Sequence, residues 1–179
     1  MGDSWPVLTV RPPWSWAIAH GGKRIENRSW DLKYRGPLWL HSGARSRWDP
    51  AGGHSPLVRA GWDWYVRNLP DWPGLPATDV TLGRRTTLMP FGAVIAAVQV
   101  IGCHHSSRCQ QPPATRYSLP TFCSPWALQE QYHVELSAVR PLPEPVPCKG
   151  ALGLWRLPDD VEKAVREQLE AAIPLLPKR

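Results

Sequence analysis

An almost unbroken apolar run is the feature of this chain that most constrains its fold. Residues 93–101 read AVIAAVQVI, and only Gln99 interrupts the apolar character. A half-buried strand alternates apolar and polar residues, so this run predicts a strand that is covered on both faces. Shorter strands are expected at four further places: 7–10, 37–41, 132–139 and within 149–158. Regular helical crossovers do not join them, which favours a small barrel over a doubly wound sheet.

Two helices are expected to flank these strands. Pro13 suits the first turn of a short helix, and the glycine pair at 21–22 suits its end. A second helix is predicted over 158–174. Its apolar residues recur with helical spacing, and Asp159 with Glu162 is predicted to form a capping box. The apolar stripe consists of Val161, Val165, Leu169 and Ile173.

The chain length of 179 residues predicts a single α+β domain spanning 1–179. Residues 46–90 read as an insertion, with one helix at about 55–68 and otherwise proline- and glycine-rich loop. The run "RPLPEPVPC", 140–148, is expected to be a proline-stiffened connector rather than a strand.

The composition limits the classes of binding partner that the chain is expected to have. The formal charge is +6 and the chain holds 11 tryptophans, which is compatible with a polyanion as partner and with aromatic stacking on bases. No apolar run approaches the roughly 20 residues of a membrane span, so no membrane association is expected. With no secretory leader at the start, four cysteines are expected to be reduced thiols, which predicts a cytoplasmic location. No pattern indicates an oligomeric state or calls for a cofactor.

The segment "HGGKRIENRSW", 20–30, places three charged residues close together as K-x-x-E-x-R. In an extended chain, Glu26 and Arg28 share a face and Lys23 points away. In a tight turn, Lys23 and Glu26 meet at i,i+3. A carboxylate held between cations can accept N–H donors from a nucleobase edge, while the cations meet carbonyl oxygens or phosphate. The alternative is a surface salt bridge that stabilises by about 0–1 kcal/mol.

The surroundings of this segment favour a binding site. Arg11 and three tryptophans, Trp14, Trp16 and Trp30, flank it in the sequence. Base recognition combines hydrogen bonds to the base edge with stacking on an aromatic face. At least one of these tryptophans can instead belong to the core.

Three blocks together resemble the ASCH domain family of the PUA-like superfamily. They are "LTVRPPWSWAIAHGGKRIENRSW", "RGPLWLHSGAR" and "YHVELSAVRPLPEPVPCKGALGLWRLP". The family's motif is G-x-K-x-x-E-x-R, which here is Gly21, Lys23, Glu26 and Arg28. The resemblance spans most of residues 5–157 and leaves out the insertion and the C-terminal helix.

The resemblance implies a small β-barrel with a cleft into which the motif projects. It implies binding of RNA or another single-stranded nucleic acid, or of an exposed or modified base. Some small bacterial members are amidohydrolases that remove the acetyl group from acetylcytidine, and ribonuclease activity is attributed to others. If this chain is an enzyme, Lys23 and Glu26 are the catalytic candidates. The amidohydrolases have a threonine nucleophile where this chain has Glu26, which favours a binding module here.

A second candidate stretch ends the predicted strand at 37–41. His41, Ser42, Gly43 and Arg45 would lie at a barrel mouth, where they could bind a base or phosphate. The alternative is a capped turn with a solvated arginine. Trp126 could form a wall of the cleft, although a core position is the favoured interpretation.

Cysteines and histidines between 103 and 123 raise the alternative of a zinc site, because thiolate and imidazole are zinc ligands. The candidate ligands are Cys103, His104, Cys109 and Cys123. The spacing matches no standard zinc finger, so the favoured interpretation is a loop with small thiols and no metal.

Overall fold

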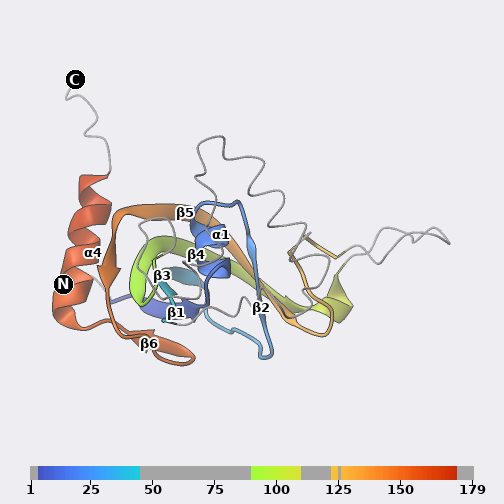
Figure 1. Cartoon of the computed structure of the whole chain (residues 1–179). Helices are drawn as coiled ribbons and strands as arrows, with labels where there is room; N and C mark the ends of the chain where they lie inside the picture. The colour runs from blue at the N-terminus through green and yellow to red at the C-terminus, as the bar shows by residue number, and fades with distance from the viewer. Residues whose placement is uncertain (1–3, 45–89, 110–121, 125, 173–179) are drawn as a thin grey trace, which may run out of the picture.

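A computed structural model describes residues 4–44, 90–109, 122–124 and 126–172 (Figure 1). The predicted helix at 55–68, the insertion up to residue 89, and Arg45 lie outside these described residues. The elements are β1 (Pro6–Val10), α1 (Trp14–Ala19), β2 (Ile25–Arg28), β3 (Gly36–Ser42), β4 (Ala93–His105), η1 (Ser106–Arg108), β5 (Tyr132–Pro147), β6 (Leu154–Arg156) and α4 (Asp159–Ala171).

The strands form one mixed sheet in the order β2-β5-β4-β3-β1-β6. Only β1 and β3 pair in parallel, and the other neighbours are antiparallel. The α+β class is therefore confirmed. The sheet is not closed into a barrel, since within the described residues β2 and β6 remain unjoined edges. Figure 1 shows β4 and β5 as long strands that bend strongly around the other strands.

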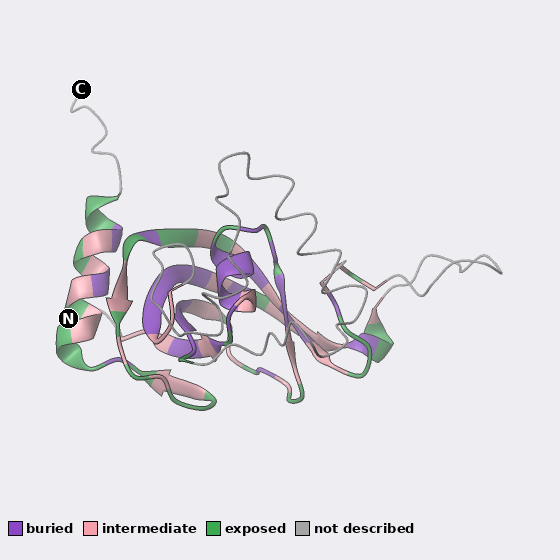
Figure 2. Cartoon of the chain, viewed as in Figure 1, coloured by how far each residue is buried: buried purple, intermediate pink, exposed green. Residues whose placement is uncertain are grey.

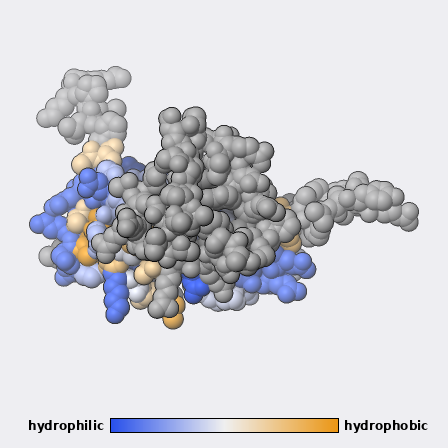
Figure 3. All heavy atoms as spheres, in the orientation of Figure 1, coloured by the Kyte–Doolittle hydropathy of each residue, from blue (hydrophilic) through white to orange (hydrophobic). Residues whose placement is uncertain are grey.

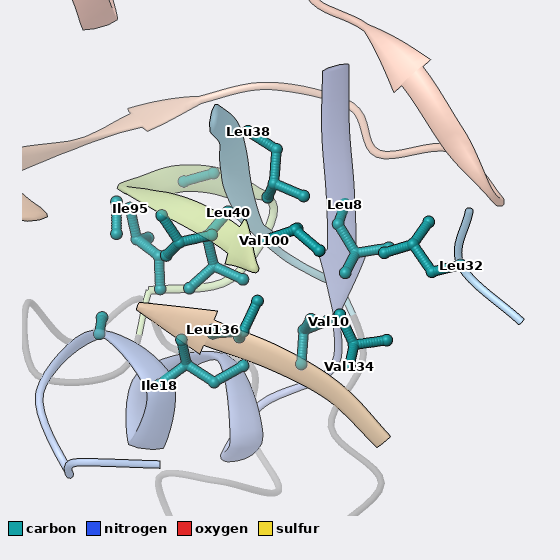
Figure 4. Close-up of a cluster of buried hydrophobic side chains, with 14 residues drawn as sticks. Leu8, Val10, Ile18, Leu32, Leu38, Leu40, Ile95, Val100, Val134 and Leu136 are labelled. Atoms are coloured by element: carbon teal, nitrogen blue, oxygen red, sulfur yellow. The ribbon is translucent and has the colours of Figure 1, made fainter. Parts of the chain in front are cut away.

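The main core lies on the concave side of this sheet and under α1. The strands contribute Leu8 from β1, Leu38 and Leu40 from β3, and Val134 from β5. The helix α1 contributes Ile18 (Figure 4). All five are at most 1 % exposed. Burying a side chain of this size stabilises the fold by about 1.5–3 kcal/mol, so this cluster holds α1 firmly against the sheet.

A second core fills the space between the other face of the sheet and α4. Val94 of β4 and Trp39 of β3 contribute to it from the strands, and α4 contributes Val165 and Leu169. The central strands are thus covered on both sides, as the apolar run at 93–101 predicts (Figure 2). On the α4 flank and at the end of the β4–β5 hairpin, hydrophilic side chains face solvent (Figure 3).

The start of α4 differs from its sequence-based prediction. Pro158 is the N-cap, and no side chain makes a capping hydrogen bond, so the capping box is wrong. Glu162 instead accepts a hydrogen bond from Ser4 Oγ at 2.5 Å and is held by Arg166 at 2.7 Å. Those two partners draw the carboxylate away from the helix N-terminus toward the first strand.

Strand β5 continues through the proline-rich stretch that was expected to be a connector. It ends at Pro147, and β4 pairs with it as far as that residue. Prolines recur at every second position from 141 to 147, so their missing N–H groups all lie on one side of the strand. Strand β2 pairs only with residues 132–135, and proline is tolerated where a strand edge has no partner.

The ends of the expected insertion lie side by side. Ser42 of β3 pairs with Ala93 of β4, and Ser42 Oγ donates a hydrogen bond to the Pro90 carbonyl oxygen at 2.5 Å. The intervening segment therefore leaves and rejoins the sheet at one place. Within the described part of the chain, no helix is long and apolar enough to cross a membrane.

Candidate functional site

A cleft of about 780 Å³ opens between β1 and β2. Both strands, the turn after β2 and two later loops contribute to its walls. The polar and aromatic side chains that line it are Thr9, Arg11, Trp14, Lys23, Glu26, Asn27, Arg28, Ser29, Trp30, Trp126 and Gln131. Its volume lies within the range of roughly 300–1,000 Å³ that small-molecule pockets occupy.

Two glycines bring the motif lysine to the inner end of this cleft. Gly21 packs against the last turn of α1, where an added Cβ would lie 3.0 Å from Ala17 Cα. Gly22 has a φ of +73°, a conformation that glycine adopts without strain. The Lys23 backbone N–H then donates to the Ala17 carbonyl oxygen at 3.0 Å. The chain turns tightly at this point and enters β2.

Lys23, Glu26 and Arg28 form a connected group of charges, here called the charged triad. Lys23 Nζ donates to Glu26 Oε2 at 2.8 Å and also to the carbonyl oxygen of Ile25. Arg28 Nε lies 3.3 Å from Glu26 Oε1, and Arg28 Nη2 donates to the Thr9 carbonyl oxygen at 2.7 Å. The structure combines parts of the two geometries: Glu26 and Arg28 share one face of β2, and Lys23 does not point away but reaches Glu26 through the turn.

Burial distinguishes this triad from a surface salt bridge. Lys23 is 2 % exposed and Glu26 is 8 % exposed. Desolvation by burial lowers the pKa of Lys23, while the charge and hydrogen bond of Glu26 raise it and the nearby Arg28 charge lowers it. A buried charge needs an opposite charge beside it, so the Glu26 carboxylate between the two cations stabilises the buried Lys23.

Aromatic side chains form the walls above the triad. Trp14 and Trp126 meet edge to face, with ring centroids 6.2 Å apart, and Trp30 is 37 % exposed at the rim. Asn27 fixes the wall that carries Trp126: its Nδ2 donates to the Trp126 carbonyl oxygen at 2.8 Å, and its Oδ1 accepts from the Leu128 N–H at 2.9 Å. The site thus combines flat apolar walls with a polar inner end.

Several residues that the sequence nominated do not line the cleft. Trp16 is buried and packs near the His20 ring. His41 is fully buried, and its Nε2 lies 3.0 Å from the Cys148 carbonyl oxygen; burial lowers its pKa. Ser42 is hydrogen-bonded to Ser15 at 2.9 Å.

Gly43 is likewise buried outside the cleft, where its N–H donates to the Val10 carbonyl oxygen at 2.8 Å. The strand end at 41–43 therefore joins β3 to its neighbours and lies away from the cleft.

Some cleft residues escaped the sequence analysis, and one was given another role there. Asn27 stands inside the motif between two charged residues, and Gln131 and Leu152 lie in loops more than 100 residues away. No sequence signal identified them, because strand alternation places Asn27 on the opposite face of β2 from Glu26. Trp126, for which a core position was favoured, lines the cleft.

The residues of the alternative zinc site are only partly brought together. His104, Cys109 and Cys123 converge, and the fourth member is His133 rather than Cys103. Successive residues of a strand point to opposite faces, so Cys103 lies on the other side of β4 from His104. It packs against the main core instead.

The fold and the cleft define a small α+β protein with a charged, aromatic-walled binding cleft. Residues 8–143 match the ASCH domain, and the chain belongs to the ASCH domain family. A comparison with curated proteins gave no match. The matched range contains the charged triad, Trp126, the whole of β2, β3 and β4, and most of β1 and β5.

Proposed function

We propose that the protein binds single-stranded or modified nucleic acid, RNA in the first place, and holds one exposed base in the cleft. The observation that carries this proposal is the buried charged triad at the inner end of a cleft walled by tryptophans. Membership of the ASCH domain family, which is generally associated with RNA binding, supports it.

Each part of the cleft has a role in this proposal. A base stacks against Trp14, Trp126 or Trp30, which is worth about 1–3 kcal/mol per base. Glu26 accepts N–H donors from the base edge, because each carboxylate oxygen has a lone pair beyond the one facing its cation. Arg11 is exposed beside the cleft and is placed to meet a phosphate.

The cleft also suggests how the expected barrel relates to the open sheet. We infer that the sheet curls into an incomplete barrel whose gap lies between the edge strand β2 and the end of β1 that β6 does not cover. The Arg28 hydrogen bond to Thr9 supports this, because it links the two strands across the gap by a side chain instead of a backbone ladder. The ligand would then enter through the gap.

Four free thiols fit the cytoplasmic location that accompanies this function.

Fluorescence anisotropy tests the proposal. Labelled RNA and single-stranded DNA oligomers, with and without modified bases, are titrated with the wild type at low salt. Trp126→Ala is expected to weaken binding about 5–100-fold through lost stacking. Glu167→Gln on α4 is the matched control, since Glu167 is exposed and far from the cleft in the sequence, and it should bind like the wild type. Flat titrations for every oligomer would refute the proposal.

A second candidate is a hydrolase acting on a modified nucleoside such as acetylcytidine, or on RNA. The observation in its favour is that burial lowers the pKa of Lys23 beside a carboxylate, an arrangement suited to proton transfer. Incubation with acetylcytidine and with labelled RNA tests it. Turnover that Lys23→Met abolishes would support the hydrolase, and turnover equal in both proteins would refute it.

A further inference from the structure

Four metal-binding side chains converge at the tip of the β4–β5 hairpin, apart from the cleft. They are His104 at the end of β4, Cys109 after η1, Cys123 in the following loop and His133 at the start of β5. Each offers one ligand atom, and these atoms all lie within 4.8 Å of one another. We propose that these residues, here called the Cys/His cluster, bind one zinc ion.

The spacing of the ligand atoms fits tetrahedral zinc. Cys109 Sγ lies 3.4 Å from His104 Nε2 and 3.2 Å from His133 Nδ1, and Cys123 Sγ lies 3.3 Å from the same Nδ1. With Zn–S near 2.3 Å and Zn–N near 2.0–2.1 Å, a tetrahedral site separates sulfur from nitrogen by about 3.5 Å. Small movements of the side chains therefore suffice to place an ion between them.

The second nitrogen of each imidazole is already held by an oxygen. His104 Nδ1 lies 2.7 Å from Glu135 Oε1, and His133 Nε2 donates to the Leu128 carbonyl oxygen at 2.8 Å. Such bonds fix the tautomer of a metal-ligating histidine and raise the basicity of the other nitrogen. In both rings that other nitrogen faces the thiols. Both imidazole rings are therefore oriented as zinc ligands require, with one nitrogen bonded to an oxygen and the other directed at the thiols.

The backbone around the cluster supports this arrangement. His104 and His133 are direct cross-strand partners of β4 and β5. Gly102 pairs with Glu135, and an added Cβ at Gly102 would lie 2.6 Å from the Glu135 carboxyl carbon. A glycine at this position leaves room for the carboxylate to reach His104.

The donor set selects the metal and the type of site. Two thiolates and two imidazoles in tetrahedral arrangement are typical of Zn²⁺, and two thiolates balance its charge. With four protein ligands the site is closed, so its role is structural. The zinc ion would tie Cys109 and Cys123 to the hairpin, and with them the segment that carries Trp126.

Metal analysis of the purified protein tests the proposal without reference to ligand binding. Protein prepared under reducing conditions is expected to hold about one zinc ion per chain, and the Cys109→Ser and Cys123→Ser variants to hold almost none. Cys148→Ser is the matched control: Cys148 is also a partly buried free thiol, outside the cluster, and this variant should keep its zinc. His105→Gln is a second control, because the His105 ring packs on Tyr132 instead.

Two further measurements do not depend on whether the serine variants fold. Wild type loaded with Co²⁺ should show the visible bands of tetrahedral cobalt and a thiolate charge-transfer band. Glu135→Gln should keep the ligands and weaken zinc binding about 10–100-fold in competition with a chromophoric chelator. Wild type that takes up neither Zn²⁺ nor Co²⁺ would overturn the proposal, and so would a Cys109–Cys123 disulfide in protein prepared with reductant.

Discussion

Strand β5 runs between two groups of polar side chains that are stabilised in different ways. On its β2 side lies the charged triad, in which Glu26 stands between the cations of Lys23 and Arg28. On its β4 side lies the Cys/His cluster, whose members are soft donors without an opposite charge among them. The two groups are close, because Asn27 and His104 both pair with His133.

The difference shows which group needs a ligand in order to be stable. In the charged triad Glu26 already pairs with both cations, which leaves a net charge of +1, so the group is held together in the free protein and the proposed base would add to it. The Cys/His cluster holds donors that face one another, and a cation is what would join them. Zinc removal should therefore disrupt the Cys/His cluster and leave the charged triad intact. Mutation of the triad should disrupt the triad and leave the Cys/His cluster intact.

The largest expected effect is that of zinc on stability. A ligand at about 1,000 times its dissociation constant stabilises the folded state by about 4 kcal/mol. Urea unfolding in a zinc buffer and in excess chelator should differ by this amount for the wild type. The Cys109→Ser variant should unfold identically in both. Superimposable wild-type curves would mean that the cluster is stable without a metal.

Breaking the charged triad should have an effect of similar size. Glu26→Ala leaves Lys23 buried without its counter-charge, and removal of one partner of a buried ion pair costs about 3–5 kcal/mol. Urea unfolding measures the loss. Glu167→Ala, which removes a carboxylate from an exposed pair on α4, should cost less than about 1 kcal/mol.

A double variant sharpens this prediction. Lys23→Met with Glu26→Leu removes both buried charges at once, so it should lose less stability than Glu26→Ala alone. Equal losses in both variants would show that the triad is held by packing and not by charge.

Asn27 joins the two regions and should give an intermediate effect. Asn27→Ala removes two hydrogen bonds to the segment 126–128, and each typically contributes about 1 kcal/mol. We expect a loss of about 2 kcal/mol, together with weaker nucleic-acid binding, because the wall carrying Trp126 is released. Asn27→Asp keeps the acceptor for Leu128 and should lose about half as much. A stable Asn27→Ala protein with unchanged binding would show that the wall is held by other contacts.

The smallest expected effect is the pH dependence arising from His41. Burial lowers the folded-state pKa of this imidazole below its ordinary value of 6.5. Between those two values the unfolded chain binds more protons, so stability is lost as the pH falls below 6.5. His41→Gln should flatten that slope in unfolding experiments between pH 7 and pH 5. A slope that is the same in both proteins would assign it to other groups.

Sequence reasoning anticipated the parts of the molecule that local pattern determines. The apolar run at 93–101 predicted a strand covered on both faces, and Val94 and Ile95 do face different cores. The C-terminal stripe predicted α4, and contact between Lys23 and Glu26 was one of the two geometries that the motif allowed. Each of these inferences rests on residues no more than about ten positions apart.

What sequence reasoning missed depends on pairing between distant segments. The extension of β5 through its prolines depends on the end of β2, which leaves that edge without a partner. His133 could not be chosen over Cys103 as a zinc ligand until the register placed it opposite His104. The burial of His41 depends on Gly150, a residue from a remote loop, where an added Cβ would lie 2.5 Å from the His41 ring.

The pairing of β2 with β5 also sets when the cleft can form during synthesis. Glu26 lies opposite Val134, so more than a hundred residues must be made before the motif meets its neighbour strand. Contacts between such distant segments form slowly, because the loop between their ends must first close. A nascent chain on the ribosome therefore carries the motif long before the cleft can form, and the cleft becomes available only after residues 132–135 have emerged.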